Sequence, residues 1–490
     1  MNNIGKNDSE LIIGIIKTAG TDISQVVQNI IDRLKSFRYD VKPIKVSKDV
    51  LSEFSEKDFS GNYKEYDRIG YYMDLGNKIR NDTGDYSILM KGVVSKILLG
   101  RENPEKPSPE KRIAYIIDSI KHPDEINFMR KTYGVGFHLI GVTSVKDRRI
   151  ECLTKEKGLT TEEAKDILTR DADESMQYGQ HTRDAFQNSD YFINITNSKD
   201  EIRANVYRLI DLLFGDPFNT PTFEEYAMFM AYASSLRSAD LSRQIGSVIT
   251  KNKEIIASGV NDCPKFGGGL YQLEYKNNEY IDEDNGRDYK IRHDSNKIEQ
   301  DKIITNILSQ LKIEKNDDNV AAIKKAGIGG LTEYGRVVHS EMEALLMCAR
   351  NNISCRDSEM YVTTFPCHNC AKHIIASGIK KVIYIEPYPK SKAFDFYKAE
   401  ISENINDISK VCFIPFTGVG PQRFIDLFST NSIHWYKKVR KDKEGYIIDW
   451  DKENADLRNP MNVFNYLDSE VATYNTYTKL VKKYKDIGDN

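Results

Sequence analysis

Residues 363–388 read TTFPCHNCAKHIIASGIKKVIYIEPY, and this stretch decides the fold of the second half of the chain. The run Glu359–Thr364 predicts a strand, helical spacing follows over Cys367–Gly378, and Lys381–Ile385 predicts another strand. Together with a predicted helix over His339–Asn352, this alternation is typical of an α/β domain.

Two cysteines in this stretch have the spacing of metal ligands. Cys367 and Cys370 lie one turn apart at a helix start, so both sulfurs share a face and the helix dipole favours their thiolates. His339, in the sequence His-Ser-Glu, supplies a third ligand. Zinc prefers thiolate and imidazole ligands, and a catalytic site has three protein ligands with water in the fourth position. We therefore expect these three side chains to bind a catalytic Zn²⁺.

Glu341 follows His339 by two residues and has the chemistry of a proton carrier. The arrangement H-x-E…P-C-x-x-C is the signature of zinc-dependent nucleobase deaminases. Zinc lowers the pKa of water, while Glu341 accepts the proton and passes it to the ring nitrogen as ammonia leaves. A C-x-x-C pair alone also occurs in structural zinc sites and redox sites, but a structural zinc would need a fourth protein ligand. We therefore predict that Glu341 is the catalytic acid and base.

Four further residues have side chains that could bind a metal. His368 and His373 lie on the same predicted helix as the two cysteines, and we interpret them as bystanders. Cys263 and His293 could hold a second zinc, but their separation is unlike that of any close-spaced ligand pair. We interpret this pair as structural.

The composition limits the class of protein. With 490 residues and 56.2 kDa, the chain has room for two to four domains of about 100–200 residues. Apolar residues make up 40% and charged residues 29%, as in globular proteins, and the net charge of -3 supplies no global attraction for nucleic acid. Seven scattered cysteines and the lack of an apolar run of about 18–20 residues predict a cytoplasmic protein without a membrane partner.

The first half of the chain alternates strand-like and helix-like stretches, which predicts a parallel sheet with helices on its faces. Gly and Pro cluster in GDPFNTP, residues 215–221, and mark a domain boundary. The predicted strands are Leu11–Ile16, Ile113–Ile117, Gly136–Val142 and Tyr191–Ile195, and the predicted helices include Asp22–Leu34 and Glu201–Phe214.

The second half begins with a predicted helix and a β-hairpin. The helix is Thr222–Asp240, and the hairpin strands are Gln244–Thr250 and Glu254–Val260. A polar segment from about 265 to 332 reads as an insertion with at most one or two helices. A helix near Phe394–Glu400 and a strand Cys412–Phe416 follow, and the tail after about residue 430 gives no clear pattern.

These motifs are similar to those of the dCMP/cytidine deaminase superfamily over about residues 225–425. The stretches SADLSRQIGSVIT, GVNDCP, HSEMEAL and FIPFTGVGPQRF, together with the zinc stretch, resemble the bacterial anti-phage dCTP deaminases most. The resemblance implies an N-terminal P-loop kinase-like parallel sheet domain, residues 1–216, joined to a C-terminal cytidine deaminase-like α/β/α domain, residues 217–490. It also implies deamination of free deoxycytidine nucleotides, dCTP to dUTP with dCMP to dUMP as an alternative, which depletes the dCTP pool in antiviral defence.

The resemblance extends to individual residues of the site. It implies that His339, Cys367 and Cys370 bind zinc and that Glu341 is the general acid/base. Asn261 in GVND matches the Asn that contacts the sugar hydroxyl, although an Asn at this position is also typical of a β-turn. The remaining substrate candidates are two hydroxyl residues that would edge the base, Thr363 and Thr364, and three cations that would bind phosphate, Arg336, Lys390 and Lys392.

The N-terminal segment departs from a working phosphate loop, G-x-x-x-x-G-K-[ST]. Gly14 and Gly20 lie six positions apart rather than five, and Thr21 stands where the Lys is needed. Lys17 could substitute, Asp118 ends a strand where a partner of Mg²⁺ would lie, and Arg148 resembles a lid arginine. We therefore expect at most nucleotide binding, with Mg²⁺, and no phosphoryl transfer.

Other functions share parts of this pattern. A housekeeping dCMP deaminase would need only about 150 residues, and an RNA or DNA base deaminase would need a basic surface that this acidic chain lacks. A non-enzymatic nucleotide sensor would not need all four zinc-site residues. We expect a homo-oligomer whose N-terminal domain responds to a regulatory nucleotide or a small RNA.

Overall fold

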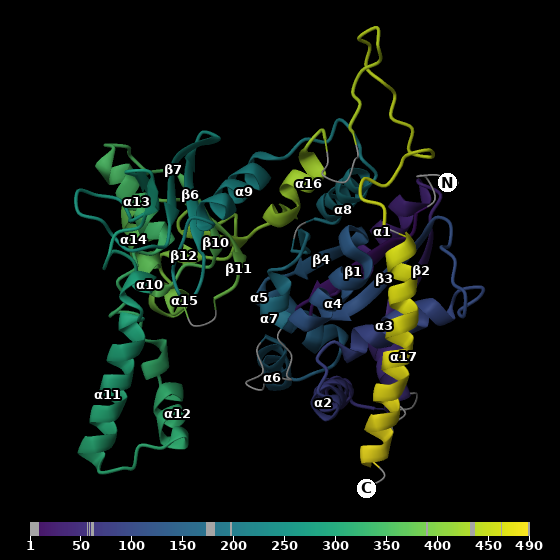
Figure 1. The fold of residues 1–490 in the computed structure, drawn as a ribbon, viewed down its shortest axis with the longest axis horizontal. Coiled ribbons are helices and arrows are strands. Elements are labelled where there is room, and N and C mark those ends of the chain that lie inside the picture. The colour runs from purple at the N-terminus through teal and green to yellow at the C-terminus, as the bar shows by residue number, and fades with distance from the viewer. Residues whose placement is uncertain are drawn as a thin grey trace. The chain divides into compact units, whose positions relative to one another are not determined.

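The computed structural model describes residues 9–55, 57, 59, 63–172, 182–196, 198–388, 391–431, 437–461 and 463–488. The chain divides into two compact units (Figure 1). The first unit combines Met1–Pro221 with Phe416–Asn490, and the second unit is Thr222–Pro415. The second domain predicted from the sequence extends to residue 490, whereas in the structure the tail, Phe416–Asn490, belongs to the first unit. In the described residues no helix is both long and apolar enough to cross a membrane.

The sheet of the first unit confirms the predicted α/β class. Its order is β14-β5-β4-β1-β3-β2, in which β1 to β5 run parallel and β14 pairs antiparallel with β5. The strands are β1 (Leu11–Lys17), β2 (Asp40–Lys45), β3 (Ile113–Ile120), β4 (Phe137–Thr143), β5 (Tyr191–Asn194) and β14 (Gly418–Val419). The sequence patterns do not predict β2, because DVKPIK has no apolar run; as an edge strand it tolerates its proline.

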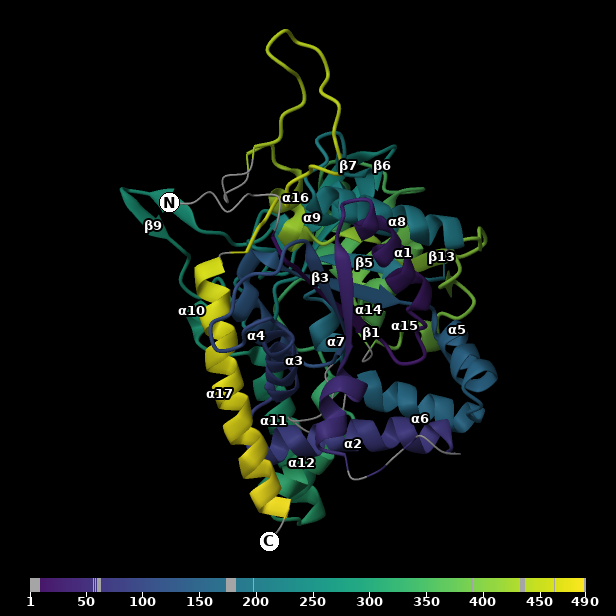
Figure 2. The ribbon, with the colours of Figure 1, turned by 90° about the vertical axis from the view of Figure 1, so that its right-hand side faces the viewer.

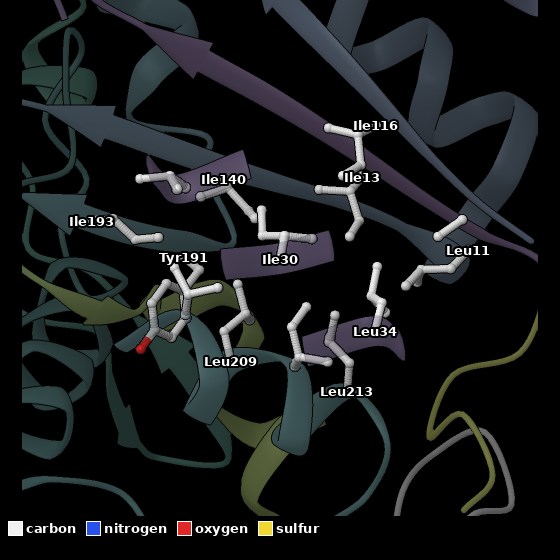
Figure 3. Close-up of a cluster of buried hydrophobic side chains, with 14 of the residues drawn as sticks. Leu11, Ile13, Ile30, Leu34, Ile116, Ile140, Tyr191, Ile193, Leu209 and Leu213 are labelled. Carbon is white, nitrogen blue, oxygen red and sulfur yellow. The ribbon is translucent and has the colours of Figure 1, made fainter. Parts of the chain in front are cut away.

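Two helical layers cover the faces of this sheet (Figure 2). On one face, α1 (Ser24–Lys35) and α8 (Lys199–Leu213) pack their apolar side chains against alternate residues of β1, β3, β4 and β5. Figure 3 shows this core, including Ile13, Ile30 and Leu209. The other described helices of the unit are α2 (Glu65–Thr83), α3 (Ile88–Leu99), α4 (Pro123–Tyr133), α5 (Lys146–Glu151), α6 (Thr161–Ala172), α7 (Thr182–Phe186), α16 (Phe424–Phe428) and α17 (Val463–Gly488).

The tail belongs to the first unit because it completes the fold there. β14 adds a strand to the sheet, and α17 packs along α3. A buried ion network joins three distant segments: Arg101 contacts Glu10, which precedes β1, at 2.7 Å and Glu470 of α17 at 2.8 Å. These side chains are at most 1% exposed. The tail therefore supplies a second carboxylate partner to the buried guanidinium that Glu10 also contacts.

The second unit is built on a mixed sheet of order β12-β13-β11-β10-β6-β7. β6 (Gly246–Lys251) pairs antiparallel both with its hairpin partner β7 (Glu254–Val260) and with β10. The strands β10 (Glu359–Thr364), β11 (Lys381–Glu386), β12 (Ile401–Ser402) and β13 (Val411–Pro415) are parallel. The helices α9 (Phe223–Ser235), α13 (Ser340–Arg350), α14 (His368–Ser377) and α15 (Ala393–Phe396) complete this core. The predicted hairpin and strand–helix–strand unit are confirmed.

The predicted insertion is more ordered than its composition suggests. It contains the hairpin β8 (Glu274–Lys276) and β9 (Glu279–Ile281), a short α10 (Asp288–Ile291), and two longer helices, α11 (Ser295–Leu311) and α12 (Asp317–Lys325). The longer helices lie side by side (Figure 1). Asn296 and Gln300 on α11 both donate hydrogen bonds to the carbonyl of Leu331, so the insertion is fixed to the segment that leads to His339.

Candidate active site

The three predicted zinc ligands lie at the starts of two neighbouring helices. His339 is the N-cap residue of α13, and Cys367 is the N-cap residue of α14. The Cys367 sulfur accepts a hydrogen bond from the backbone N–H of Cys370 at 3.4 Å. Because β10 ends at Thr364, the short loop to α14 brings both cysteines to the carboxyl edge of the sheet.

The ligand atoms are close enough for one metal ion. Nδ1 of His339 lies 3.4 Å from the sulfur of Cys367 and 3.4 Å from that of Cys370, and all three atoms lie within 4.8 Å of one another. Zinc–sulfur bonds of about 2.3 Å and zinc–nitrogen bonds of about 2.0–2.1 Å place tetrahedral ligand atoms about 3.5–4 Å apart. The triad therefore fits zinc.

The pKa shifts of the three side chains show that they share protons, which a metal cation can replace. The Cys370 thiol donates a hydrogen bond to the Cys367 sulfur, and with His339 beside it this lowers the pKa of Cys367. The same contact, together with burial, raises the pKa of the Cys370 thiol, because a second thiolate beside the first is unfavourable. The hydrogen bond to Cys367 raises the pKa of His339 to about 9. A bound Zn²⁺ would take the place of the protons that these groups share.

Glu341 lies in the first turn of α13 and is buried, with 4% of its surface exposed. Ser340 Oγ donates a hydrogen bond to its Oε2 at 3.0 Å. Burial and the negative charge of Cys367 raise the pKa of the Glu341 carboxyl. A raised pKa makes this carboxyl a better proton acceptor than an ordinary glutamate, and a general acid and base must both accept and return a proton.

These groups open into a cavity of about 370 Å³. Its size falls in the range of sites for small molecules. The walls come from the zinc loops, the segment before β6, the end of β10 and the insertion: Asp240, Leu241, Ser242, Arg243, Ile245, Asn261, Asp288, Asp294, Asn296, Gly330, Thr332, Gly335, Val337, His339, Glu341, Thr364, Phe365, Cys367, His368 and Tyr388. Cys370 is buried behind this surface.

Residues 221–386 match the family described as the cytidine and deoxycytidylate deaminase zinc-binding region. The chain is 32% identical over 163 residues to the deoxycytidylate deaminase of Enterobacteria phage T4, which covers 33% of this chain and 77% of that protein. The chain belongs to this deaminase family. It is also 28% identical over 210 residues to the Mus musculus deoxycytidylate deaminase, covering 42% of this chain and 87% of the mouse protein.

Two solved structures align with parts of the chain. The dCMP deaminase from cyanophage S-TIM5, in complex with dCMP and dUMP, covers 41% of this chain and 100% of its own, with 19% identity and a TM-score of 0.24. Dephospho-CoA kinase from Campylobacter jejuni covers 41% of this chain and 96% of its own, with 14% identity and a TM-score of 0.22.

From here on, Thr222–Pro415 is called the deaminase unit.

Two of the predicted substrate residues line the cavity of the deaminase unit. Asn261 does so, but its side-chain amide already binds the backbone: Oδ1 accepts from Ile245 N at 2.7 Å, and Nδ2 donates to Arg243 O at 2.8 Å. Thr364 also lines the cavity. Thr363 does not; its hydroxyl accepts a hydrogen bond from Gly246 N–H at 3.2 Å.

Of the three cations predicted to bind phosphate, the two that lie in the described residues, Arg336 and Lys392, do not line the cavity. Arg336 is held by Asp288 at 3.0 Å and by backbone carbonyls of the insertion. Lys392 is exposed and lies 3.5 Å from Asp395. Neither lines the cavity, and Lys390 lies outside the described residues.

The cavity also contains residues that the sequence patterns do not predict. Arg243 and Tyr388 line it, with the guanidinium 5.8 Å from the centre of the tyrosine ring. His368, interpreted above as a bystander, lines it too. In the sequence, Arg243 stands out only because it follows SADLS directly and precedes a predicted strand. The zinc ligands come 96 or more residues later, so no local spacing connects Arg243 to them.

The N-terminal phosphate-loop residues occupy different places from those expected. Gly14 lies inside β1, where a Cβ atom would approach Phe137 to 2.9 Å, so the loop begins only after Lys17. Gly20, with φ of 76°, forms the turn, Thr21 is buried beside Thr18, and Arg148 is exposed.

Internal carboxylates already bind an amide of this loop and two lysines beside it. Lys17 contacts Asp118 at 2.9 Å. The backbone N–H of Ala19 donates to Asp171 at 2.6 Å, and Lys121 contacts the same carboxylate at 2.6 Å. A phosphate at this loop would therefore have to displace Asp171 from the amide.

Proposed function

We propose that this chain catalyses the zinc-dependent hydrolytic deamination of deoxycytidine nucleotides, dCTP to dUTP and, as an alternative, dCMP to dUMP. The observation that carries this proposal is the placement of buried Glu341 and the His339/Cys367/Cys370 triad at one cavity. Family membership supports the reaction type, and the deoxycytidylate deaminases among the relatives support a deoxycytidine nucleotide.

The residues of the cavity divide the chemistry among them. Zinc, when bound by the triad, supplies Lewis acidity that lowers the pKa of water. Glu341 takes a proton from that water and delivers it to the ring nitrogen beside the amino-bearing carbon of cytosine. The water oxygen adds to that carbon, and Glu341 then takes the second proton from this oxygen and passes it to the amino group. The carbon–nitrogen bond breaks, ammonia leaves, and the carbonyl of uracil forms. Burial keeps Glu341 suited to both transfers.

The charges of the cavity favour a free nucleotide over a nucleic acid. Among the described lining residues, Arg243 is the one Lys or Arg, whereas four residues are acidic: Asp240, Asp288, Asp294 and Glu341. A single guanidinium can bind one phosphate group, but a polynucleotide needs many cations along its backbone. We assign the phosphate contact to Arg243.

Ammonia release tests the substrate class directly. We expect turnover of dCTP or dCMP, weak turnover of deoxycytidine because the phosphate contact is missing, and none of single-stranded DNA. A clear preference for dCMP over dCTP would favour the housekeeping alternative. Efficient turnover of deoxycytidine or single-stranded DNA would contradict the proposal.

The biological role that we propose is depletion of dCTP during phage infection, with the first unit as the regulator. The two Lys–Asp pairs at its loop and the absence of a Lys after Gly20 support regulation rather than phosphoryl transfer. Cells that carry the full chain should lose dCTP and restrict phage, and Glu341→Ala should abolish both effects. ATP hydrolysis by the purified chain that Lys17→Ala eliminates would contradict the regulatory assignment.

A further inference from the structure

Glu386, the last residue of β11, connects two residues that line the cavity. Its Oε1 accepts a hydrogen bond from Arg243 Nη1 at 2.8 Å, and its Oε2 accepts one from Thr364 Oγ1 at 2.9 Å. The Glu386 side chain is 12% exposed and is not itself part of the cavity wall. One carboxylate therefore holds both a cation and a hydroxyl of the cavity.

The sheet fixes the position of this carboxylate relative to the zinc loop. Thr364 and Glu386 are direct partners in the parallel ladder of β10 and β11, and Phe365 N–H donates to the Glu386 carbonyl at 2.7 Å. The chain continues from Phe365 to Cys367 after a single proline. Glu386 consequently occupies a defined place beside the zinc ligands, on a rigid element.

Arg243 depends on Glu386 for the orientation of its side chain. Asn261 and Asp240 fix the Arg243 backbone, since Asn261 binds its carbonyl and Asp240 accepts from its N–H at 2.9 Å. The side chain is nevertheless 47% exposed, and Glu386 is the only carboxylate paired with it among the described residues. Without that partner, a long cationic side chain at the surface has many rotamers to choose from.

We propose that Glu386 is a positioning residue for nucleotide binding, directing Arg243 to the phosphate and Thr364 to a donor group of the nucleoside. The Thr364 hydroxyl donates its hydrogen bond to Glu386, so the hydroxyl oxygen offers only lone pairs to the cavity. Thr364 therefore selects a hydrogen-bond donor on the ligand. This proposal rests on the proposed function, because it takes a phosphate-bearing nucleoside as the substrate.

The test is steady-state kinetics of Glu386→Gln with dCTP, dCMP and unphosphorylated deoxycytidine. A lost charge-assisted contact predicts a rise in nucleotide KM of about tenfold, with kcat changed by less than about threefold. For deoxycytidine, kcat/KM should change by less than about threefold, because the glutamine oxygen can still accept from Thr364 while its NH2 group cannot accept from Arg243. An unchanged nucleotide KM, or an equal loss with deoxycytidine, would overturn the positioning role.

Glu359 provides a matched control at the other end of the same ladder. It also pairs with a cation, Lys381 at 2.9 Å, and with a hydroxyl, Tyr361 at 3.2 Å, but it lies away from the cavity. Glu359→Gln should leave the nucleotide KM unchanged. If it raised the KM as much as Glu386→Gln does, the effect would be structural and the proposal would fail.

Arg243→Ala separates this proposal from the phosphate assignment. We expect Arg243→Ala to raise the nucleotide KM and Glu386→Gln to add less than about threefold in that background, because the two changes act on one contact. If Arg243→Ala leaves the nucleotide KM unchanged, the phosphate assignment and the positioning role both fail. If it raises the KM while Glu386→Gln does not, only the positioning role fails.

Discussion

Single side-chain contacts decide what the deaminase cavity presents to a ligand. Asn261 was expected to contact the sugar, yet both ends of its amide bind the backbone on either side of Gln244. An Asn that fixes a loop can still line a cavity, but half of the hydrogen-bonding capacity of its amide is already used. Its main effect is to hold the segment that carries Arg243.

Asn261→Ala should therefore destabilise the deaminase unit. Its loss leaves the partly buried carbonyl of Arg243 and N–H of Ile245 without their side-chain partner, which costs about 1–3 kcal/mol each at most. Urea unfolding measures the change. Asn351→Ala is the control, because that exposed amide binds one helical carbonyl, and it should change stability by less than about 0.5 kcal/mol. Equal effects for the two variants would contradict the clamp assigned to Asn261.

At the scale of elements, the packing of β7 against α13 brings the site together. Gly259 on β7 lies so close to α13 that a Cβ atom would come within 1.9 Å of the Ser340 carbonyl and 2.7 Å of the Ala344 nitrogen. These are backbone atoms of the helix whose first turn carries His339 and Glu341. Glycine is required here by the close approach of two backbones.

Gly259→Ala should displace the start of α13, reducing stability by about 1–3 kcal/mol and lowering zinc content and activity together. Thermal unfolding and metal analysis give both readouts. Gly70→Ala on α2 is the control, because its Cβ atom would meet only the end of the Arg170 side chain at 3.8 Å. That change should stabilise the first unit by about 0.5–1 kcal/mol. Full zinc content in Gly259→Ala would contradict the packing argument.

The sequence predicts the parts of this site that are local in the chain. His339, Glu341, Cys367 and Cys370 could be assigned because their spacing within two short motifs has chemical meaning. The Arg243–Glu386 pair could not, because 143 positions separate the partners and each looks like a surface charge. The strands with apolar runs could be predicted, whereas the polar edge strand β2 could not. The insertion was predicted with at most one or two helices, and the structure has α10, α11 and α12 there.

At the scale of the whole chain, the return of the tail to the first unit is the feature that local patterns cannot reveal. Glu470 reaches Arg101 across 369 positions, and Tyr466 and Tyr133 complete the network by binding Glu10 and Glu470. Arg101 thus has two carboxylate partners in a buried site. Burial raises the pKa of Glu470, because one guanidinium does not compensate two carboxylates.

Glu470→Ala should destabilise the first unit, because it leaves buried donors of Arg101 and Tyr133 without an acceptor, at a cost of about 1–3 kcal/mol each. Denaturant unfolding of the full chain measures this, and Asp468→Ala, outside the network on the same helix, is the control. A change below about 1 kcal/mol in Glu470→Ala would contradict the structural role of the tail.

The pH dependence of Glu470→Gln has a defined sign. A carboxyl with a raised pKa binds more protons in the folded state, so its contribution to stability falls as pH rises from the ordinary carboxyl pKa through the raised value. Glutamine cannot titrate, and the stability difference between the wild type and Glu470→Gln should therefore narrow over that interval. A difference that widens with rising pH would contradict the raised pKa.

The central claim, zinc-dependent deamination with Glu341 as the proton carrier, is tested most directly by measuring zinc content and ammonia release together in two variants. Glu341→Ala should keep one zinc per chain and lose at least about 10²–10⁴-fold in kcat, because Glu341 moves protons and does not bind the metal. Cys367→Ala should lose both the zinc and the activity. A Glu341→Ala protein that lacks zinc, or one that retains full ammonia release, would contradict the account.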